Sequence, residues 1–329
     1  MIINDPIPYV TYKNHYEWGF NDIPFSFRDS MDDVYFTRYG KLTRRPFNWR
    51  DECVATARLI YDEAKGDPIR VFFSGGMDSA VVAEAFRLSG VPFTVATIVY
   101  NDNWNWHDIK FAIDWCEQYG IKQDMIDCDV IKFWESGDCF NIGYAVQSRS
   151  PQYCVHLWGV DQIDGFPVIG LGEGELYRKN GMILEPDGEY CRAWERHLIV
   201  RNRSGAGSFF KYTPELKVCQ FLDDSFIDWA NDSSSYDLIK FYKNEMYQKH
   251  FPNLETRYAI NSIYGDNYTD YNGSEFLPRK ALQAETKARI ELRKHFEDYH
   301  YVIETEYNVQ MKRLLPEELF SEFMEKRKQ

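Results

Sequence analysis

The chain has 329 residues, of which 44% are hydrophobic and 27% are charged, values that are ordinary for a globular protein of one or two domains. Its 38 basic and 51 acidic residues give a formal net charge of -13, which disfavours a dedicated binder of nucleic acid or of anionic membranes. No apolar run reaches the roughly 18 residues of a membrane span, and the N-terminus lacks the pattern of a secretory signal. We therefore expect a soluble, cytoplasmic protein without a membrane partner.

The chain begins with an extension, residues 1–50, that is rich in aromatic residues and turn formers. From Trp49 to Ala64 the apolar residues recur at helical spacing, so a helix is expected to lead into the next unit. The seven cysteines form no CxxC pair and no spacing suited to zinc, which predicts reduced, mostly buried thiols.

The second unit, residues 51–180, alternates the patterns of strands and helices. Apolar or β-branched stretches predict strands at residues 70–73, 93–100, 122–127 and 166–169. Amphipathic stretches predict the intervening helices at residues 78–88, 106–119, 130–135 and 152–163. Strands separated by helices imply right-handed crossovers, and so an α/β fold with an open, doubly wound parallel sheet.

The third unit, residues 181–329, has a different character and is expected to form a substrate-binding or lid region. Dipeptides typical of hairpin turns stand near its start, at Asn180-Gly181 and Asp187-Gly188. Residues 201–208 contain two glycines and two serines and predict a mobile loop. The remainder, from about residue 214 onward, is predicted to be mainly helical.

A candidate phosphate loop joins the first strand of the second unit to its helix. The sequence there is Ser74-Gly75-Gly76-Met77-Asp78-Ser79. A helix N-terminus that opens directly from a glycine turn directs backbone N–H groups and the positive end of the helix dipole toward an anion. Ser74 and Ser79 can add hydroxyl donors, and Asp78 is a natural ligand for Mg²⁺. The GxxxxGK[ST] pattern of γ-phosphate-transferring enzymes is absent.

The hexapeptide resembles the PP-loop of the N-type ATP pyrophosphatases. Residues 50–180 are most similar to the synthetase domain of asparagine synthetases and β-lactam synthetases. The resemblance rests on the loop, on Tyr100-Asn101-Asp102 after the second strand, on the helix start Ser150-Pro151, and on Gly172-Glu173-Gly174. It implies an adenine nucleotide alpha hydrolase-like fold, with ATP cleaved between the α and β phosphates.

The resemblance also implies roles for individual residues. The nucleotide would contact Ser74, Gly75, Gly76, Met77, Asp78, Ser79, Ile98, Tyr100 and Gly172, with the adenine near Ile98 and Tyr100. Mg²⁺ would be held by Asp78 and by Glu175, because this chain lacks the Asp that the family usually carries after Gly-Glu-Gly. The implied catalytic residues are Asp78, Glu175, the acid/base group Glu173 and the phosphate-contacting Lys287.

Other cations are candidates for contact with the pyrophosphate. Arg178 and Lys179 follow the second loop, and Lys280 shares the predicted C-terminal helix with Lys287. A cluster of arginines could form a lid over the phosphates, at Arg192, Arg196, Arg201 and Arg203.

The implied reaction is that of an AMP-forming ligase. An oxygen of a carboxylate or nucleotide-like acceptor would attack the α-phosphate, which forms an adenylate and releases pyrophosphate. An amine would then displace AMP from this adenylate. The family's N-terminal glutaminase domain is not found here, so ammonia, an amine of the substrate or a separate glutaminase would supply the nitrogen. Two alternatives stay open: a PP-loop enzyme that modifies a nucleotide or a tRNA base, and a catalytically reduced ATP-binding module, which the shortened Gly-Glu-Gly loop favours.

Overall fold

A parallel sheet of four strands forms the centre of the protein. The computed structural model describes residues 16–40, 42–172, 174–232, 243–255, 277–296 and 301–327. All neighbouring strands of this sheet run parallel, in the order β6-β5-β4-β7. The strands are β4 (Ile69–Phe72), β5 (Thr94–Tyr100), β6 (Gln123–Cys128) and β7 (Phe166–Val168). The predicted strands and the doubly wound α/β fold are confirmed.

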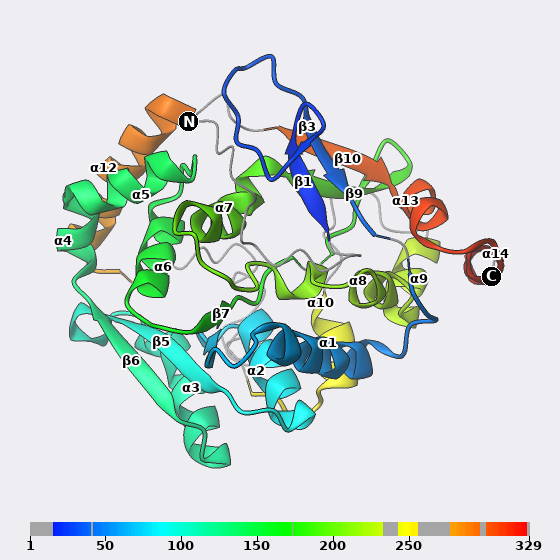
Figure 1. The fold of residues 1–329 in the computed structure, drawn as a ribbon, viewed down its shortest axis with the longest axis horizontal. Helices are drawn as coiled ribbons and strands as arrows, with labels where there is room; N and C mark the ends of the chain where they lie inside the picture. Colours follow the sequence, from blue (N-terminus) through cyan, green and yellow to red (C-terminus); the bar gives the residue numbers. More distant parts are fainter. Residues whose placement is uncertain are drawn as a thin grey trace.

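Helices cover both faces of this sheet (Figure 1). One face carries α1 (Trp49–Glu63), α2 (Met77–Ser89) and α3 (Trp106–Tyr119). The other carries α4 (Val130–Glu135), α5 (Gly137–Ala145), α6 (Pro151–Asp161) and α12 (Arg279–Phe296). Successive strand residues point to opposite faces, so Val71 and Phe73 join the first core and Phe72 joins the second.

The strand order places a change of direction between β4 and β7. From β4 the chain moves outward to β5 and β6, and it then returns to pair β7 with the free side of β4. In open α/β sheets, the loops that leave the carboxyl ends of the strands diverge at such a point and leave a crevice. The predicted phosphate loop follows β4, so the topology brings it to this crevice.

Two antiparallel sheets flank the central unit. One contains β8 (Tyr177–Lys179), β9 (Met182–Gly188) and β10 (Val302–Glu306), and the other contains β1 (Glu17–Phe20), β2 (Ile23–Pro24) and β3 (Tyr35–Arg38). The hairpin predicted at Asn180-Gly181 is confirmed, because it joins β8 to β9 with positive φ at both residues.

The hairpin predicted at Asp187-Gly188 is wrong. Both residues lie within β9 and pair with β10. The carboxylate of Asp187 is buried, where the side chains of Lys211 and Tyr16 bind it, so the residue is held in an extended strand rather than in an exposed turn.

The remaining described elements are mainly helical, as the sequence predicts. The α-helices are α7 (Ala193–Val200), α8 (Pro214–Phe221), α9 (Asp224–Asn231), α10 (Lys243–His250), α13 (Tyr307–Leu314) and α14 (Glu317–Lys326). Short 3₁₀ helices occupy Asn101–Asn103, Glu189–Arg192 and Phe209–Lys211. Within the described ranges, every helix is too short or too polar to span a lipid bilayer.

Residues 201–208 are anchored to the sheet, which corrects the prediction of a mobile loop. The N–H of Ala206 donates to Pro167 at 2.8 Å, and its carbonyl accepts from Ile169 at 2.9 Å, so this segment extends the edge of β7. The Arg203 guanidinium donates to the carbonyls of Gly165 and Val160. These bonds satisfy the backbone groups that a free loop would leave to water.

Three buried carboxylates lie in β9 and directly after it: Glu185 and Asp187 in the strand, and Glu189 at the start of the following 3₁₀ helix. Glu185 and Asp187 stand two residues apart and therefore share one face of the strand. Each is paired with a cation from a different segment: Lys217–Glu185, Lys211–Asp187 at 3.2 Å and Arg28–Glu189 at 3.0 Å. This buried ionic network joins the N-terminal segment to β9, α8 and the 3₁₀ helix before α8.

Candidate functional site

The loop after β4 opens directly into α2. Gly76 is the N-cap of α2, and no side chain caps the helix. The first N–H groups of an α-helix have no partner within the helix. Gly76 carries no side chain to bind them, so the backbone N–H groups at this end of α2 keep the arrangement that favours an anion.

Gly75 can only be glycine in this loop. Its φ is +87°, in the left-handed region, and a Cβ atom there would lie 1.8 Å from the carbonyl oxygen of Asp108. The loop therefore packs directly against the start of α3.

Two serines hold the loop in this shape. The hydroxyl of Ser79 donates to the carbonyl of Gly76 at 2.9 Å and accepts from the N–H of Ser74 at 3.3 Å. On the other side, a Cβ at Gly170 would lie 3.0 Å from the nitrogen of Ser79, so the chain after β7 passes close to the loop. The two segments thus meet at the same edge of the sheet, as their parallel strands predict.

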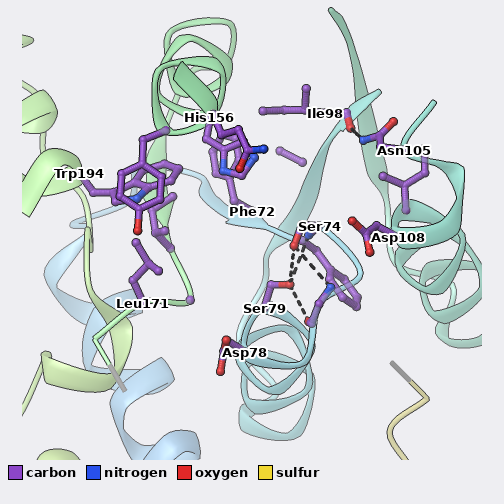
Figure 2. A pocket seen from close by; sticks show the side chains of 18 of the residues that line it. Phe72, Ser74, Asp78, Ser79, Ile98, Asn105, Asp108, His156, Leu171 and Trp194 are labelled. Carbon is purple, nitrogen blue, oxygen red and sulfur yellow. Dashed lines mark hydrogen bonds between the residues drawn. The ribbon is translucent and has the colours of Figure 1, made fainter. Parts of the chain in front are cut away.

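A pocket of about 560 Å³ lies over this edge. That volume is within the usual range for small-molecule sites. Its walls come from the loop, the end of β5, the start of α3, α6, the residues after β7, and α7 (Figure 2). The predicted residues that line it are Ser74, Gly76, Met77, Asp78, Ser79, Ile98 and Tyr100.

Two carboxylates, Asp78 and Asp108, line the pocket and are the only charged side chains among its described lining residues. They lie on different sides of the loop in Figure 2. The hydroxyl of Tyr247 donates to Asp78 Oδ1 at 2.9 Å, and the Tyr247 ring stacks on Trp49 with centroids 4.5 Å apart. Asp78 is thus oriented by α10, which packs on α1.

The end of β5 is fixed by one side chain. The amide of Asn105 donates to the carbonyl of Ile98 at 2.8 Å and accepts from the N–H of Tyr100 at 2.9 Å. Ile98 and Tyr100 line the pocket where the adenine is predicted, and Asn105 already binds these two backbone groups. Their side chains, and the neighbouring Ala96, are the surface left for a nucleotide base.

The far wall of the pocket is aromatic and uncharged. It includes Gln152 and His156 of α6, Leu171 after β7, and Trp194 of α7. Burial lowers the pKa of His156 to about 4, although the Asp108 charge opposes the shift. The imidazole is therefore neutral at pH 7, with one donor and one acceptor nitrogen.

Several predicted residues lie away from the pocket. Glu173 falls outside the described residues. Gly172 packs against Ser208 and Lys211, and Gly174 is bound by Gln220 of α8 at 2.8 Å. The chain therefore turns from the sheet edge toward α8, and Glu175 is exposed rather than directed to the phosphates.

The predicted cations also lie elsewhere. Lys280 and Lys287 are exposed on α12, whose buried face packs on α4, α5 and α6. The arginines of the proposed lid have structural partners. Arg192 pairs with Glu195, Arg196 binds the carbonyl of Val146, Arg201 pairs with Asp161, and Arg203 binds carbonyls near β7. Arg178 binds carbonyls at the end of α9, and Lys179 pairs with Glu304.

Sequence reasoning missed several lining residues, notably Asn105, Asp108, His156 and Trp194. Asp108 could have been found, because it stands in the first turn of the helix after the second strand. Trp194 could not, because α7 lies outside the alternating unit. The seven cysteines are unpaired, six of them buried, as predicted, and none lines the pocket.

Comparison with known proteins gives little beyond this geometry. No family model and no curated protein matches the sequence. The structure of NMN synthetase from Francisella tularensis has 13% identity and a TM-score of 0.30, over 76% of this chain and 96% of its own. The U34-tRNA thiolase NcsA from Methanococcus maripaludis has the same identity and TM-score, over 74% of this chain and 79% of its own. Similarity this low carries no inference about activity.

Proposed function

We propose that this protein binds ATP with its phosphates on the Ser74–Ser79 loop and cleaves it between the α and β phosphates. One observation carries the proposal: the glycine-capped N-terminus of α2 opens into a pocket of about 560 Å³. That pocket lies where the strand order of the sheet reverses, between β4 and β7, and where the loops that leave these strands diverge. The loop's resemblance to a PP-loop supports the α,β position of cleavage.

Mg²⁺ is the ion that we propose to accompany ATP. Asp78 and Asp108 supply the hard oxygen ligands that this ion prefers, and Mg²⁺ commonly uses one or two carboxylates with substrate phosphates. Asp78, at the start of α2, is the residue that would hold the ion together with the phosphates. When bound, the ion would neutralise charge on the phosphates.

The chemistry asked of the chain is positioning and charge stabilisation. An oxygen of the acceptor attacks the α-phosphorus, the bond to the bridging oxygen breaks, and its electrons leave with pyrophosphate. N–H groups at the start of α2 face the charge that develops on this leaving group. An amine, supplied free, by the substrate or by a separate glutaminase, then displaces AMP and joins the acceptor.

An ATP-binding module without catalysis is the second candidate. It is favoured by the exposed position of Glu175 and by the lack of any Lys or Arg among the described lining residues. A module of this kind would bind ATP at the same loop and release neither AMP nor pyrophosphate.

Product analysis tests the proposal. The protein is incubated with ATP, Mg²⁺ and a protein-free metabolite extract as the source of acceptor, and the nucleotides are separated by chromatography. AMP with an equal amount of pyrophosphate is expected, and Asp78→Asn should lose both. ADP as the main product would contradict the proposed cleavage. ATP binding without AMP would favour the module.

A further inference from the structure

One wall of the pocket is uncharged and carries side-chain hydrogen-bonding groups that have no partner in the described protein. We call the side formed by Gln152, His156, Leu171 and Trp194 the neutral recess. Gln152 and His156 are four residues apart on α6, so they share one face of the helix. Figure 2 shows His156 and Trp194 across the pocket from Asp108, with Ser74 and Ser79 between them. The recess is therefore next to the proposed phosphate site.

The polar atoms of the recess lack protein partners. The indole of Trp194 is 5% exposed, and its N–H has no acceptor among the described residues. No hydrogen bond joins the side chain of Gln152 or His156 to another part of the described chain. Buried polar groups in folded proteins are normally satisfied, so the buried Trp194 N–H indicates a ligand that accepts a hydrogen bond. The half-buried side chains of Gln152 and His156 line the same wall and offer that ligand further donors and acceptors.

The charge of the pocket restricts that ligand. Asp78 and Asp108 are acidic, and the described lining contains neither Lys nor Arg. His156 adds no positive charge, because burial keeps it neutral at pH 7. A carboxylate in the recess would leave water without a Lys or Arg among the described lining residues to pair with it, and any Mg²⁺ of the site would already be shared with the phosphates of ATP. A neutral group avoids this cost of removing a charge from water.

The shape of the recess favours a flat ligand. The rings of His156 and Trp194 have centroids 5.9 Å apart, and Leu171 adds an apolar contact. Aromatic walls of this kind pack against planar rings. Neutral amide edges in such a ring would match the indole donor and the mixed donors and acceptors of Gln152 and His156.

We propose that the neutral recess binds the acceptor, and that this acceptor is an uncharged planar heterocycle with an amide-type edge, of the nucleobase class, rather than a free carboxylate. This inference rests on the proposed function, which supplies the ATP. The ring carbonyl oxygen forms the bond to the α-phosphorus. The bond to the bridging oxygen breaks with its electrons on pyrophosphate, and the proton of the neighbouring ring N–H passes to water.

Binding of two probes of similar size tests the inference. Uracil and benzoate are titrated by calorimetry into the protein saturated with Mg²⁺ and α,β-methylene-ATP. Uracil should bind at least about tenfold more tightly than benzoate, because each hydrogen bond to a buried partner contributes several-fold in affinity. Gln152→Lys, which adds a cation to the recess, should tighten benzoate at least about tenfold and weaken uracil. Gln162→Lys adds the same charge at the exposed end of α6 and should change neither.

Each outcome decides a different point. If the nucleotide analogue binds but uracil is no tighter than benzoate, the inference is overturned and the proposed function stands. If the analogue itself fails to bind, the proposed function fails first, and the inference fails with it. Should Gln152→Lys not fold, Trp194→Phe decides instead: it removes the N–H, keeps the ring, and should weaken uracil about fivefold without affecting benzoate.

Discussion

Asp78 shows how one side chain of the site depends on distant parts of the chain. It stands in the first turn of α2, where a carboxylate is also favoured by the helix dipole. Its Oδ1 accepts from Tyr247, whose ring lies on Trp49 at the start of α1. The orientation of the carboxylate is thus set by residues far from the loop in sequence.

Tyr247→Phe should weaken the response to Mg²⁺. Removing the hydroxyl frees the carboxylate to rotate, so the Mg²⁺ concentration for half-maximal binding of α,β-methylene-ATP should rise about fivefold, as for the loss of one hydrogen bond. Calorimetry at several Mg²⁺ concentrations measures this. Tyr307→Phe is the control, because Tyr307 is equally buried and donates to the carbonyl of Phe221, away from the pocket. An unchanged Mg²⁺ dependence in Tyr247→Phe would count against the metal role of Asp78.

His156 makes stability depend on pH. Its pKa is lowered to about 4 by burial, whereas a histidine in an unfolded chain titrates near 6.5. Between these values the unfolded chain binds more protons than the folded one, so stability falls as the pH decreases. From pH 7.5 to pH 5 the histidine should account for a loss of about 2 kcal/mol in the free energy of unfolding. Urea denaturation at the two pH values should show that His156→Gln loses about 2 kcal/mol less unfolding free energy than the wild type. An equal loss in both proteins would refute the lowered pKa of His156.

The path of the chain from β4 into α2 depends on two glycines, one in the loop and one after β7. Gly75 allows the turn, and Gly170 lets the chain after β7 approach α2. Gly66, after α1, has a similar backbone, with φ +97°, but a Cβ there would meet nothing within 4 Å. The two positions therefore separate the cost of backbone strain from the cost of a clash.

Gly75→Ala should destroy the phosphate site, whereas Gly66→Ala should be mild. A left-handed non-glycine residue costs about 1 kcal/mol, which is the whole effect expected at residue 66. At residue 75 the added methyl also collides with the Asp108 carbonyl, so the loop must move. Thermal unfolding and α,β-methylene-ATP binding measure the two effects. Retention of nucleotide affinity in Gly75→Ala would show that the loop does not cradle the phosphates.

The sequence predicts local features of this unit better than long-range ones. The strands, the phosphate loop and the helix α3 follow from periodicity and from Ser-Gly-Gly, which act over a few residues. Asp187-Gly188 and residues 201–208 were mispredicted because their conformation depends on Lys211 and on β7, which are distant in sequence. Glu175 was misplaced for the same reason, since Gln220 binds the chain beside it and draws it toward α8.

Across the whole protein, the buried ionic network links the N-terminal segment to β9 and α8, which are far apart in sequence. Lys217 is fully buried and pairs with Glu185, and burial lowers the Lys217 pKa although Glu185 opposes this. Arg28 of the N-terminal segment pairs in the same way with the buried carboxylate of Glu189. A buried pair contributes little over an apolar pair of equal size, but one partner alone is strongly destabilising.

Lys217→Met should therefore lower the free energy of unfolding by about 3 to 5 kcal/mol, because Glu185 loses its cation. The double variant Lys217→Met with Glu185→Leu should recover most of this loss, because no unpaired charge then remains. Urea denaturation of the two variants and the wild type measures both effects. A double variant as unstable as the single one would show that packing, rather than charge, dominates at this position.

A crystal structure with α,β-methylene-ATP and Mg²⁺ tests the central claim most directly. We expect the β and γ phosphates at the N-terminus of α2, against the N–H groups between Gly75 and Ser79. We also expect the base beside Ile98 and Tyr100, and the α-phosphate facing the recess of His156 and Trp194. A nucleotide bound outside this pocket, or one with its base at the start of α2, would contradict it.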